Sequence, residues 1–446
     1  MPSYDETRDD SARALDSHQR ARPGLVFLLL AGAPSLVTLE VSPLGIELGR
    51  GVPNELLEAD DRISRRHVRL RRAQGGWVVT DLDSRNGTFV DGQPLRSEST
   101  FAREVLIRIG RTLVWAVDDL APFRQRAQRQ PADAGPVLGG RLQRAWSEIA
   151  LASRAGTTLY VRGESGSGKE LAAQAFHEAR FGVGSKAPFV AVNCAAIPEG
   201  LAERLLFGAQ RGAYSGANVD AEGYVQAAHR GTLFLDEIAE LDPLVQSKLL
   251  RVLEAREVLP LGATKPRSVD IAVCVASHKS LRDEVGKSRF REDLYFRLGR
   301  PEVQLPPLRE RLDELPWLIT RELLGVDPQL AAGVGFVEAC ALRPWPGNVR
   351  ELLLEVRRAG HAALQERAGL VEPHHLATEA GTLLVGPSAD PPTVKMRAKP
   401  PTDDEIVRAL DENEGNVRGT ARALGIHRNQ LRRWLEKRGQ SADSQD

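Results

Sequence analysis

Two short stretches between residues 163 and 237 carry the residue types that bind and cleave nucleotide phosphates. The first, residues 163–170, follows a short apolar run and precedes a helix-like one. Its glycines let successive backbone N–H groups turn toward phosphates, and the helix N-terminus adds partial positive charge. Lys169 would reach the β- and γ-phosphates. Glu170 stands where such a loop normally has Ser or Thr as an Mg²⁺ ligand, so we expect the metal to be held largely from elsewhere.

The second stretch, residues 231–237, is an apolar run that ends in two carboxylates. Asp236 would hold Mg²⁺ directly or through its waters, and Glu237 would polarise the attacking water. Alone, such a segment would be an ordinary buried strand with a solvated acidic end. Together with the upstream loop in one domain it predicts an ATPase that uses ATP and Mg²⁺.

Between these two stretches lies a loop rich in small residues, which by itself would be a flexible surface loop because its glycines disfavour a helix. Its centre reads Gly-Ala-Tyr-Ser-Gly-Ala. It resembles the Gly-Ala-Phe-Thr-Gly-Ala loop of the AAA+ domain in bacterial activators of sigma-54 RNA polymerase, where ATP-dependent motion raises the loop to the sigma factor. The resemblance implies a sigma-54 contact by Gly212, Ala213, Tyr214, Ser215, Gly216 and Ala217.

The resemblance covers nearly all of residues 137–377 and gives roles to further positions near the nucleotide. Asn193 follows a buried-strand pattern and would hold Glu237 until the γ-phosphate is sensed. Ser277 and His278 stand where the family has Thr-Asn as a γ-phosphate sensor. Imidazole can replace an amide as a hydrogen-bond donor, but it titrates near neutral pH. Arg350 corresponds to the second sensor arginine in the lid.

Residues 290–298 resemble the arginine-finger segment of the same family. An arginine supplied by a neighbouring subunit stabilises the transferring phosphoryl group and is worth about 10³–10⁵ in rate. The resemblance therefore implies a homo-oligomeric ring, hexameric by analogy. The predicted catalytic residues are Glu237, Asp236, Lys169, Arg291, Arg297 and Asn193, with Asp236 also on the metal. The predicted ATP-binding residues are Gly163, Glu164, Ser165, Gly166, Ser167, Gly168, Lys169, Glu170, Ser277, His278 and Arg350.

Three polar fragments lie on turns among short apolar runs between residues 24 and 117, a spacing that predicts an all-β sandwich. They are residues 49–50, 64–67 and 83–88, and separately they would be hairpin turns and polar strand ends. In this order they resemble the forkhead-associated (FHA) domain, which binds phosphothreonine peptides. Guanidinium and hydroxyl groups form charge-assisted bonds to a phosphate. The resemblance assigns phosphate contacts to Arg50, Ser64 and Arg65, a peptide-backbone contact to Asn86, and loop shape to Gly49 and His67.

The C-terminal segment, residues 403–438, has helical periodicity interrupted by short glycine turns, which indicates a helix-turn-helix. It could also be a small helical bundle with a basic face. The run from Gly415 to Ile426 resembles the Fis-type DNA-binding domain of the same activators. The residues expected to contact base edges and phosphates are Arg428, Asn429, Gln430, Arg432 and Arg433.

These observations predict a multidomain chain with an all-β FHA sandwich, an α/β AAA+ P-loop ATPase with an α-helical lid, and an all-α helix-turn-helix. We expect a disordered N-terminus at 1–22, the FHA phosphothreonine-binding domain at 23–118, a linker at 119–136, the α/β ATPase subdomain at 137–312, the helical lid at 313–377, a linker at 378–402 and the DNA-binding domain at 403–440.

Composition sets the remaining limits. The 446 residues include 60 Lys and Arg and 60 Asp and Glu, so any attraction for nucleic acid must come from local patches. Three widely spaced cysteines indicate reduced thiols and a cytoplasmic protein. The uncharged stretch at 24–39 is broken by Gly-Ala-Pro-Ser and is too short to cross a membrane, so we expect strands there and no membrane association.

The sequence thus predicts a sigma-54-dependent activator that binds enhancer-like double-stranded DNA and remodels sigma-54 RNA polymerase, under the control of a threonine-phosphorylated protein. One alternative is a DNA-binding AAA+ regulator that does not engage sigma-54, which the near-intact loop at 212–217 disfavours. Another is a phosphoprotein-binding scaffold whose ATPase only switches assembly, which the intact acidic pair and arginine segment disfavour.

Overall fold

The computed structural model describes residues 21–51, 55–123, 135–198, 200–213, 219–383 and 403–412, with single positions at 420, 424 and 431. The chain divides into two compact units, Met1–Leu383 and Leu384–Asp446. The predicted loop residues Tyr214, Ser215, Gly216 and Ala217 and all five predicted DNA contacts lie outside the described residues. Among the helices that the structure describes, none is both long and apolar enough to cross a bilayer.

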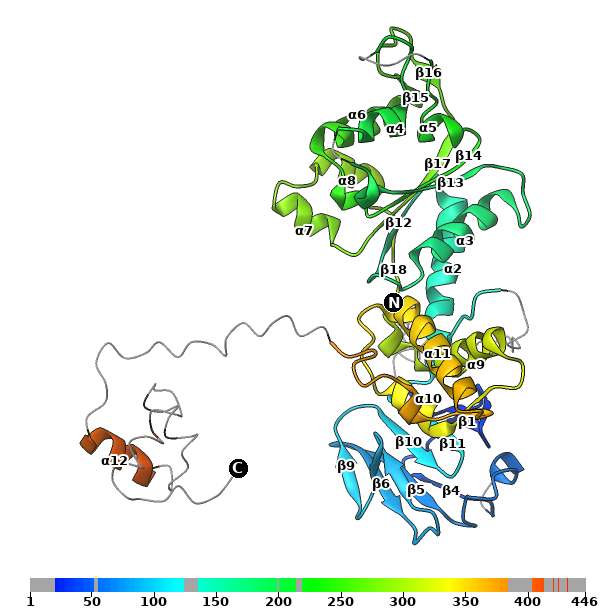
Figure 1. Cartoon of the computed structure of the whole chain (residues 1–446), viewed down its shortest axis with the longest axis vertical. Helices are drawn as coiled ribbons and strands as arrows, with labels where there is room; N and C mark the ends of the chain where they lie inside the picture. Colours follow the sequence, from blue (N-terminus) through cyan, green and yellow to red (C-terminus); the bar gives the residue numbers. More distant parts are fainter. Residues whose placement is uncertain are drawn as a thin grey trace, which may run out of the picture. The chain divides into compact units, whose positions relative to one another are not determined.

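The first part of the larger unit is a sandwich of two antiparallel sheets (Figure 1). One sheet has the order β2-β1-β11-β10-β7-β8, with β3 paired to β1, and the other has the order β4-β5-β6-β9. This confirms the all-β prediction. The strands are β1 (Gly24–Leu30), β2 (Ala33–Pro34), β3 (Thr38–Glu40), β4 (Ile46–Leu48), β5 (Val68–Ala73), β6 (Gly76–Asp81), β7 (Thr88–Val90), β8 (Gln93–Pro94), β9 (Ser99–Phe101), β10 (Val105–Ile109) and β11 (Thr112–Val117), with a short 3-10 helix η1 (Glu55–Leu57) after β4.

Strand β1 is buried on both faces, which explains why its sequence carries no charge. Leu25 and Phe27 point into the sandwich core. Val26 and Leu28, on the opposite face, belong to a second core that also contains residues of the ATPase lid. The run that looked superficially like a membrane segment is therefore a central strand held between two cores.

The ATPase begins with a parallel sheet in the order β13-β14-β17-β12-β18. In such sheets the ligand site lies beyond the carboxyl ends of the strands. The strands are β12 (Thr158–Arg162), β13 (Phe189–Asn193), β14 (Gly231–Asp236), β17 (Ile271–Ser277) and β18 (Glu302–Gln304). The main helices beside them are α2 (Gly140–Ala155), α3 (Lys169–Phe181) and α6 (Pro243–Ala255).

Several shorter helices and one two-stranded hairpin lie around this sheet. They are η3 (Cys194–Ala196), α4 (Ala202–Phe207), α5 (Tyr224–Ala227), η4 (Ile238–Glu240), the hairpin β15 (Glu257–Val258) and β16 (Arg267–Ser268), α7 (Leu281–Gly286) and α8 (Glu292–Leu298). Ala209 pairs with Ala221 across the base of the loop that contains Gly212 and Ala213, through backbone hydrogen bonds of 2.9 and 2.8 Å. The base of the predicted sigma-54 loop is therefore anchored.

A helical lid follows the sheet and packs against the sandwich as well as the ATPase (Figure 1). It consists of η5 (Leu308–Glu310), η6 (Leu312–Glu314), α9 (Leu315–Val326), β19 (Ala331–Ala332), α10 (Val334–Ala341), α11 (Asn348–Gln365), β20 (Leu370–Val371) and η7 (Pro373–His375). Trp115 and Leu106 of the sandwich share one apolar core with Leu315 and Phe336 of the lid. The short helix η2 (Ala121–Phe123) adds Phe123 to this core.

Polar contacts reinforce the junction between sandwich and lid. Arg108 on β10 forms an ion pair of 2.6 Å with Glu338 on α10, and its guanidinium lies 3.8 Å from the centre of the Phe89 ring. Arg141 at the start of α2 forms an ion pair with Glu104 of the sandwich. The two domains that the sequence predicts as separate are thus joined by a continuous core, although the linker lies between them in the chain.

In the smaller unit the structure describes one helix, α12 (Asp403–Glu412). Ile406 and Ala409 of α12 are buried together with Leu424 and Leu431. The periodic apolar positions of the C-terminal segment therefore form a small core of their own, as a helix-turn-helix requires.

Candidate active site and ligand-binding sites

The phosphate-binding loop runs from the end of β12 to the start of α3, which begins at Lys169. Gly166 and Gly168 have φ angles of 73° and 104°, values that side chains disfavour. A Cβ at Gly166 would also lie 2.1 Å from the Gly347 carbonyl oxygen. Lys169 is 7% exposed, and its Nζ donates to the Gly163 carbonyl at 3.3 Å and to Glu237 at 2.9 Å. The loop thus presents a buried ammonium to the acidic pair.

The acidic pair stands at the carboxyl end of β14. Glu237 adopts a left-handed conformation (φ 52°), which ends the strand, and its N–H donates to Asp236 at 3.0 Å. Burial raises the pKa of Asp236 more than the charge of Lys169 lowers it. Burial also acts to raise the pKa of Glu237, but hydrogen bonds from Lys169 and His278 outweigh it and hold that pKa below its usual value. Both groups face a site that favours a cation.

The adjacent strand β17 brings the predicted sensor residues to the same edge of the sheet. The backbone N–H of His278 and its Nδ1 lie 3.3 and 2.7 Å from Glu237 Oε2. Ser277 is buried, and its hydroxyl accepts a hydrogen bond from the Lys279 N–H. His278 therefore contacts the acidic pair directly.

Asn193 makes a different contact from the one the resemblance implies. Its carboxamide oxygen accepts a hydrogen bond of 3.0 Å from the Ala195 N–H and caps η3. Both oxygens of Glu237 are meanwhile bonded to Lys169 and His278. In this structure Asn193 is thus a helix cap, and the predicted Asn193–Glu237 pair is replaced by a His278–Glu237 pair.

The lid holds the phosphate-binding loop through three residues to which the sequence patterns gave no role. Arg309 binds both carboxylate oxygens of Glu164, at 2.8 and 2.9 Å, and the Asn348 amide donates to the same carboxylate at 3.1 Å. Buried Arg311 donates to the Ser167 carbonyl at 3.1 Å. The partners of Arg309 and Arg311 lie more than 140 residues away in the chain, so no local pattern reveals these contacts.

The other predicted ATP-binding positions surround this loop. Arg350 lies exposed on α11, and its Cβ would lie 3.1 Å from a Cβ added at Gly166 of the phosphate-binding loop. Glu170 is exposed on the first turn of α3. Val349 donates a backbone hydrogen bond of 3.2 Å to Gly166. The lid helix therefore begins directly against the phosphate-binding loop.

The two predicted arginine fingers lie on or beside α8 and are exposed. Arg291 binds the carboxylate of Asp293 with two hydrogen bonds, at 3.1 and 2.6 Å. Arg297 donates to the Leu253 carbonyl at 3.3 Å. Phe296, between them in sequence, is 71% exposed and lines a shallow depression together with Arg291. This surface pairs an apolar side chain with exposed cations.

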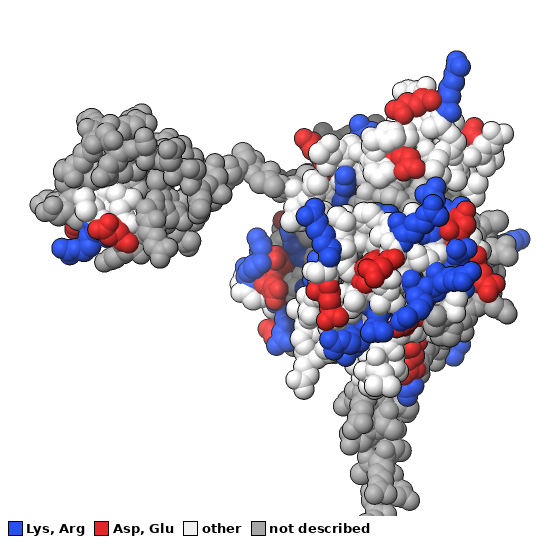
Figure 2. Space-filling view, turned by 90° about the horizontal axis from the view of Figure 1, so that it is seen from below, with Lys and Arg blue, Asp and Glu red and all other residues white. Residues whose placement is uncertain are grey.

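The three predicted phosphopeptide fragments meet at one end of the sandwich. The Arg50 N–H donates to the Ser64 carbonyl at 3.0 Å, and the Arg85 N–H donates to the Ser64 hydroxyl at 3.0 Å. The Asn86 amide donates to the Arg62 carbonyl at 2.7 Å. Arg50, Arg65 and Asn86 are exposed. Figure 2 views the molecule from below and shows basic side chains interspersed with acidic ones.

His67 is the buried support of these loops and is 0% exposed. Its Nδ1 accepts a hydrogen bond from the Ser64 N–H at 3.0 Å, so its proton resides on Nε2, which lies 3.2 Å from the Gly87 carbonyl. Burial lowers the pKa of His67. A neutral imidazole thus ties the Ser64 loop to the Gly87 turn. A Cβ at Gly49 would lie 2.3 Å from the Arg65 carbonyl oxygen, so that position also shapes the loop.

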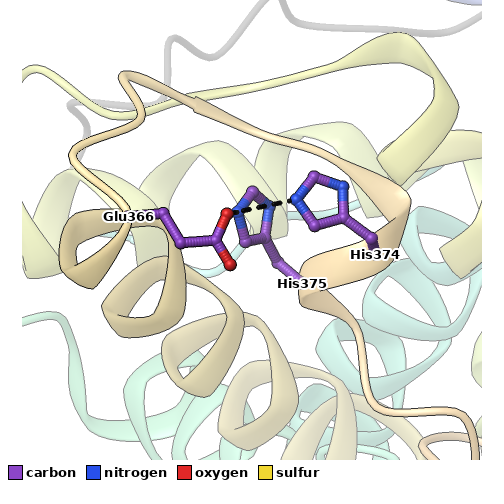
Figure 3. Close-up of side chains that lie close together, drawn as sticks. All are labelled: Glu366, His374 and His375. Atoms are coloured by element: carbon purple, nitrogen blue, oxygen red, sulfur yellow. Dashed lines mark hydrogen bonds and ion pairs between the residues drawn. The ribbon is translucent and has the colours of Figure 1, made fainter.

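A separate cluster in the lid contains Glu366, His374 and His375 (Figure 3). Both imidazole Nε2 atoms lie close to Glu366 Oε2, at 3.3 and 3.2 Å. The Nδ1 of His375 accepts a hydrogen bond from the Glu372 N–H, so its proton is on Nε2. Metal-bound histidines instead donate through their second nitrogen. The cluster is therefore a hydrogen-bonded group and a poor metal centre.

Comparisons with known proteins match all three parts of the chain. Residues 139–304 match the Sigma-54 interaction domain family, residues 46–111 the FHA domain family, and residues 404–437 the bacterial regulatory proteins of the Fis family.

Relatives with the same central domain extend this match. UacR of Escherichia coli (strain K12) is 46% identical over 204 residues, which are 44% of this chain and 34% of UacR. The hydrogenase transcriptional regulatory protein HoxA of Cupriavidus necator is 38% identical over 337 residues, 71% of this chain and 70% of HoxA. The DNA-binding transcriptional regulator NtrC of Klebsiella pneumoniae is 36% identical over 362 residues, 73% of this chain and 76% of NtrC. The chain belongs to the family of sigma-54-dependent transcriptional regulators, with a AAA+ ATPase domain between an FHA domain and a Fis-type helix-turn-helix.

Proposed function

We propose that this chain activates transcription by binding an enhancer-like DNA site, assembling a homo-oligomeric ring and using ATP hydrolysis to remodel sigma-54 RNA polymerase to the open complex. The observation that carries the proposal is the convergence of Lys169, Asp236 and Glu237 at the carboxyl edge of the sheet, inside the domain that matches the Sigma-54 interaction family. A ring of six subunits follows by analogy with the family, and the domain boundaries predicted above are part of the proposal.

Each of these three side chains would act on the nucleotide from the carboxyl edge of the sheet. Lys169 would leave Glu237 for the β- and γ-phosphates, and Glu237 would then accept a proton from the attacking water. Asp236 suits Mg²⁺ because it offers a half-buried carboxylate oxygen as a ligand. A single carboxylate is enough, since this ion keeps several of its own waters. The ion would neutralise charge on the phosphates. Arg350 would complete the nucleotide contacts from the lid.

Arg291 and Arg297 would act on the nucleotide of a neighbouring subunit. Their partners within one chain are a carboxylate on the same helix turn and a single carbonyl, both of which a phosphate could replace. The exposed Phe296 beside them supports an interface at this surface, because large exposed apolar groups mark interaction sites.

The loop around Tyr214 and Ser215 would carry the motion to sigma-54. Its anchored base at Ala209 and Ala221 supports a loop that moves as a unit from a fixed origin. The C-terminal residues Arg428, Asn429, Gln430, Arg432 and Arg433 would contact DNA and gather the subunits at one site.

The sandwich would supply control by binding a threonine-phosphorylated protein. Arg50, Ser64 and Arg65 offer two guanidinium groups and a hydroxyl within one loop cluster, and Asn86 stands beside them for the peptide backbone. A phosphothreonine peptide should therefore bind the chain at least tenfold more tightly than its unphosphorylated form, and Ser64→Ala with Arg65→Ala should abolish the difference. Equal affinity for both peptides would leave the sandwich a scaffold for unmodified partners.

Capture of sigma-54 tests the activator function. A Glu237→Gln chain should bind ATP without hydrolysing it and so retain the raised loop. We expect this variant with ATP to retain sigma-54, and the added change Ser215→Ala to abolish retention. Ser147→Ala, an exposed serine on α2, is the matched control. ATP binding without any capture would favour the AAA+ regulator that does not engage sigma-54, whereas retention that ignores Ser215 would assign the sigma-54 contact to another part of the chain.

A further inference from the structure

Strand order places His278 beside Glu237 independently of any nucleotide. β17 is the neighbour of β14, and their register pairs Leu235 with Val275. Extending that register by two residues brings Ser277 beside Glu237. His278, the next residue, then lies at the edge of the sheet with a side chain that is 46% exposed.

We infer that His278 is the positioning residue that holds Glu237 at rest in this chain, the task that the family resemblance gives to Asn193. The inference rests on the proposed role of Glu237 in activating water. It adds a second role to the position where the family keeps a phosphate sensor.

The contacts at Glu237 leave its carboxylate fully engaged. Oε1 accepts from Lys169 at 2.9 Å, and Oε2 accepts from the His278 backbone at 3.3 Å and from its imidazole at 2.7 Å. The imidazole must carry a proton on Nδ1 for this bond, because a carboxylate only accepts. A carboxylate held by three donors is a poor acceptor for a proton from water, and its lowered pKa agrees with that.

Asn193 is on the other side of β14, and its carboxamide oxygen is already engaged. Its strand, β13, places it in register with Asp236, one residue before Glu237. Its carboxamide oxygen caps η3 through Ala195. Glu237 is therefore held by the imidazole of His278, next to β17, and not by the neutral amide of Asn193 on β13, which lies on the other side of β14.

This arrangement gives a simple route for release. Arriving phosphates attract Lys169 and free Oε1, while His278 still holds Oε2. Because His278 is half exposed at the same edge, a γ-phosphate oxygen can compete with Glu237 for its N–H. When His278 turns to the phosphate, Glu237 is freed to accept a proton, so that sensing and release occur in one side chain.

The test compares ATP turnover and promoter opening for the full chain and three variants. His278→Ala should raise turnover without polymerase by about tenfold, the effect of losing one charge-assisted hydrogen bond, and should lower the number of promoters opened per ATP hydrolysed. His278→Asn, which keeps a donor, should restore most of the coupling. Asn193→Ala should leave the ratio of opening to hydrolysis unchanged.

Each outcome bears on the inference. Wild-type coupling in His278→Ala, or uncoupling in Asn193→Ala, would overturn it, and binding of ADP by each variant confirms that the site has folded. Glu237→Gln separates this inference from the proposed function. If that variant still hydrolyses ATP, the proposed role of Glu237 is wrong, whereas loss of turnover there with an unaltered His278→Ala refutes only the holding role.

Discussion

At the scale of single residues, the site is a set of charges that satisfy one another until a nucleotide arrives. The ammonium of Lys169 lies 2.9 Å from Glu237 and 4.0 Å from Asp236. A triphosphate would replace these carboxylates as the partner of the ammonium. The acidic pair is then left to the metal and to water, which is the arrangement that hydrolysis needs.

Glu237→Gln should therefore separate binding from hydrolysis. The amide keeps the size of the side chain but cannot accept a proton from water, so turnover should fall by about 10²–10⁴, the range for loss of a general base. Nucleotide affinity should stay within a few-fold of the wild type. Steady-state turnover and calorimetric titration with ATP measure the two effects. Turnover within threefold of wild type would assign the base to another residue.

His67 should make the phosphopeptide loops sensitive to acid. Its pKa is lowered by burial, so the unfolded chain binds a proton more readily than the folded loop does. The stabilisation is complete above the unfolded value of about 6.5 and is lost as the pH falls below it, by at most about 1.4 kcal/mol per pH unit. Hydrogen exchange of peptides within residues 64–90, corrected for intrinsic rates from pH 7.5 to 5.5, should show this loss.

His67→Asn gives the control for that experiment. Asparagine can still accept from the Ser64 N–H, but it does not titrate. The variant should be less protected at every pH and should lose the additional slope. An equal slope in both proteins would place the titrating group elsewhere.

The sequence predicts which residues belong to these sites better than it predicts which of them contact one another. Lys169, Asp236 and Glu237 are recognisable because a phosphate-binding loop and an acidic strand end have local signatures. The partner of Glu237 is not local, since it depends on which strand lies beside β14 and on the side chain that follows it. The roles of Arg309 and Arg311 were missed for the same reason.

At the scale of elements, the phosphate-binding loop is held between the parallel sheet and the helical lid. Glu164 of the loop binds Arg309 and Asn348 at the start of the lid. Gly166 lets the loop approach the lid helix closely, because a Cβ there would lie 2.1 Å from the Gly347 carbonyl oxygen. A change in the position of the lid should therefore shift the loop that binds the phosphates through this contact.

Arg309→Ala should weaken ATP binding more than it lowers the turnover at saturation. It leaves the Glu164 carboxylate without its bidentate partner beside a site that must receive a triphosphate. Because both side chains are more than 40% exposed, we expect a loss of only about fivefold in affinity, near 1 kcal/mol. Arg357→Ala, which breaks an exposed lid pair with Glu322, is the control. Equal effects of both variants would mean a general loosening of the lid.

The sequence predicts which segments are strands, but it does not predict which elements cover them. The spacing of apolar runs and turn residues predicts the sandwich, and β12, β14 and β17 read as buried strands because parallel strands are covered on both faces. The uncharged β1 is the instructive exception. Its second apolar face has no local explanation, because the lid that covers it lies almost 300 residues later in the chain.

At the scale of the whole molecule, the sandwich is attached to the helical lid of the ATPase. Residues of β1, β11, α9 and α10 share one apolar core, which joins the sandwich to the lid. The sequence predicts a linker between independent domains and could not reveal this core. Under the proposed function, a partner bound at the loops would be able to affect the ATPase through this core.

Charge reversal tests that junction. Arg108→Glu places a carboxylate against Glu338, which is 7% exposed, and should destabilise docking by about 3 kcal/mol or more. Hydrogen exchange should then rise in β10 and α10, while the sandwich core around Trp77 stays protected. Adding Glu338→Arg should restore protection. Unchanged exchange in the single variant would show that the two domains are not docked in solution.

The central claim is that ATP hydrolysis by this chain opens promoters through sigma-54. Its most direct test is permanganate reactivity of promoter DNA with sigma-54 RNA polymerase, the full chain and an upstream binding site. We predict single-stranded thymines with ATP and the wild-type chain, and none with a non-hydrolysable analogue, with Glu237→Gln or with Ser215→Ala. ATP hydrolysis at normal rates without any opening, or opening that persists in Glu237→Gln, would contradict the account.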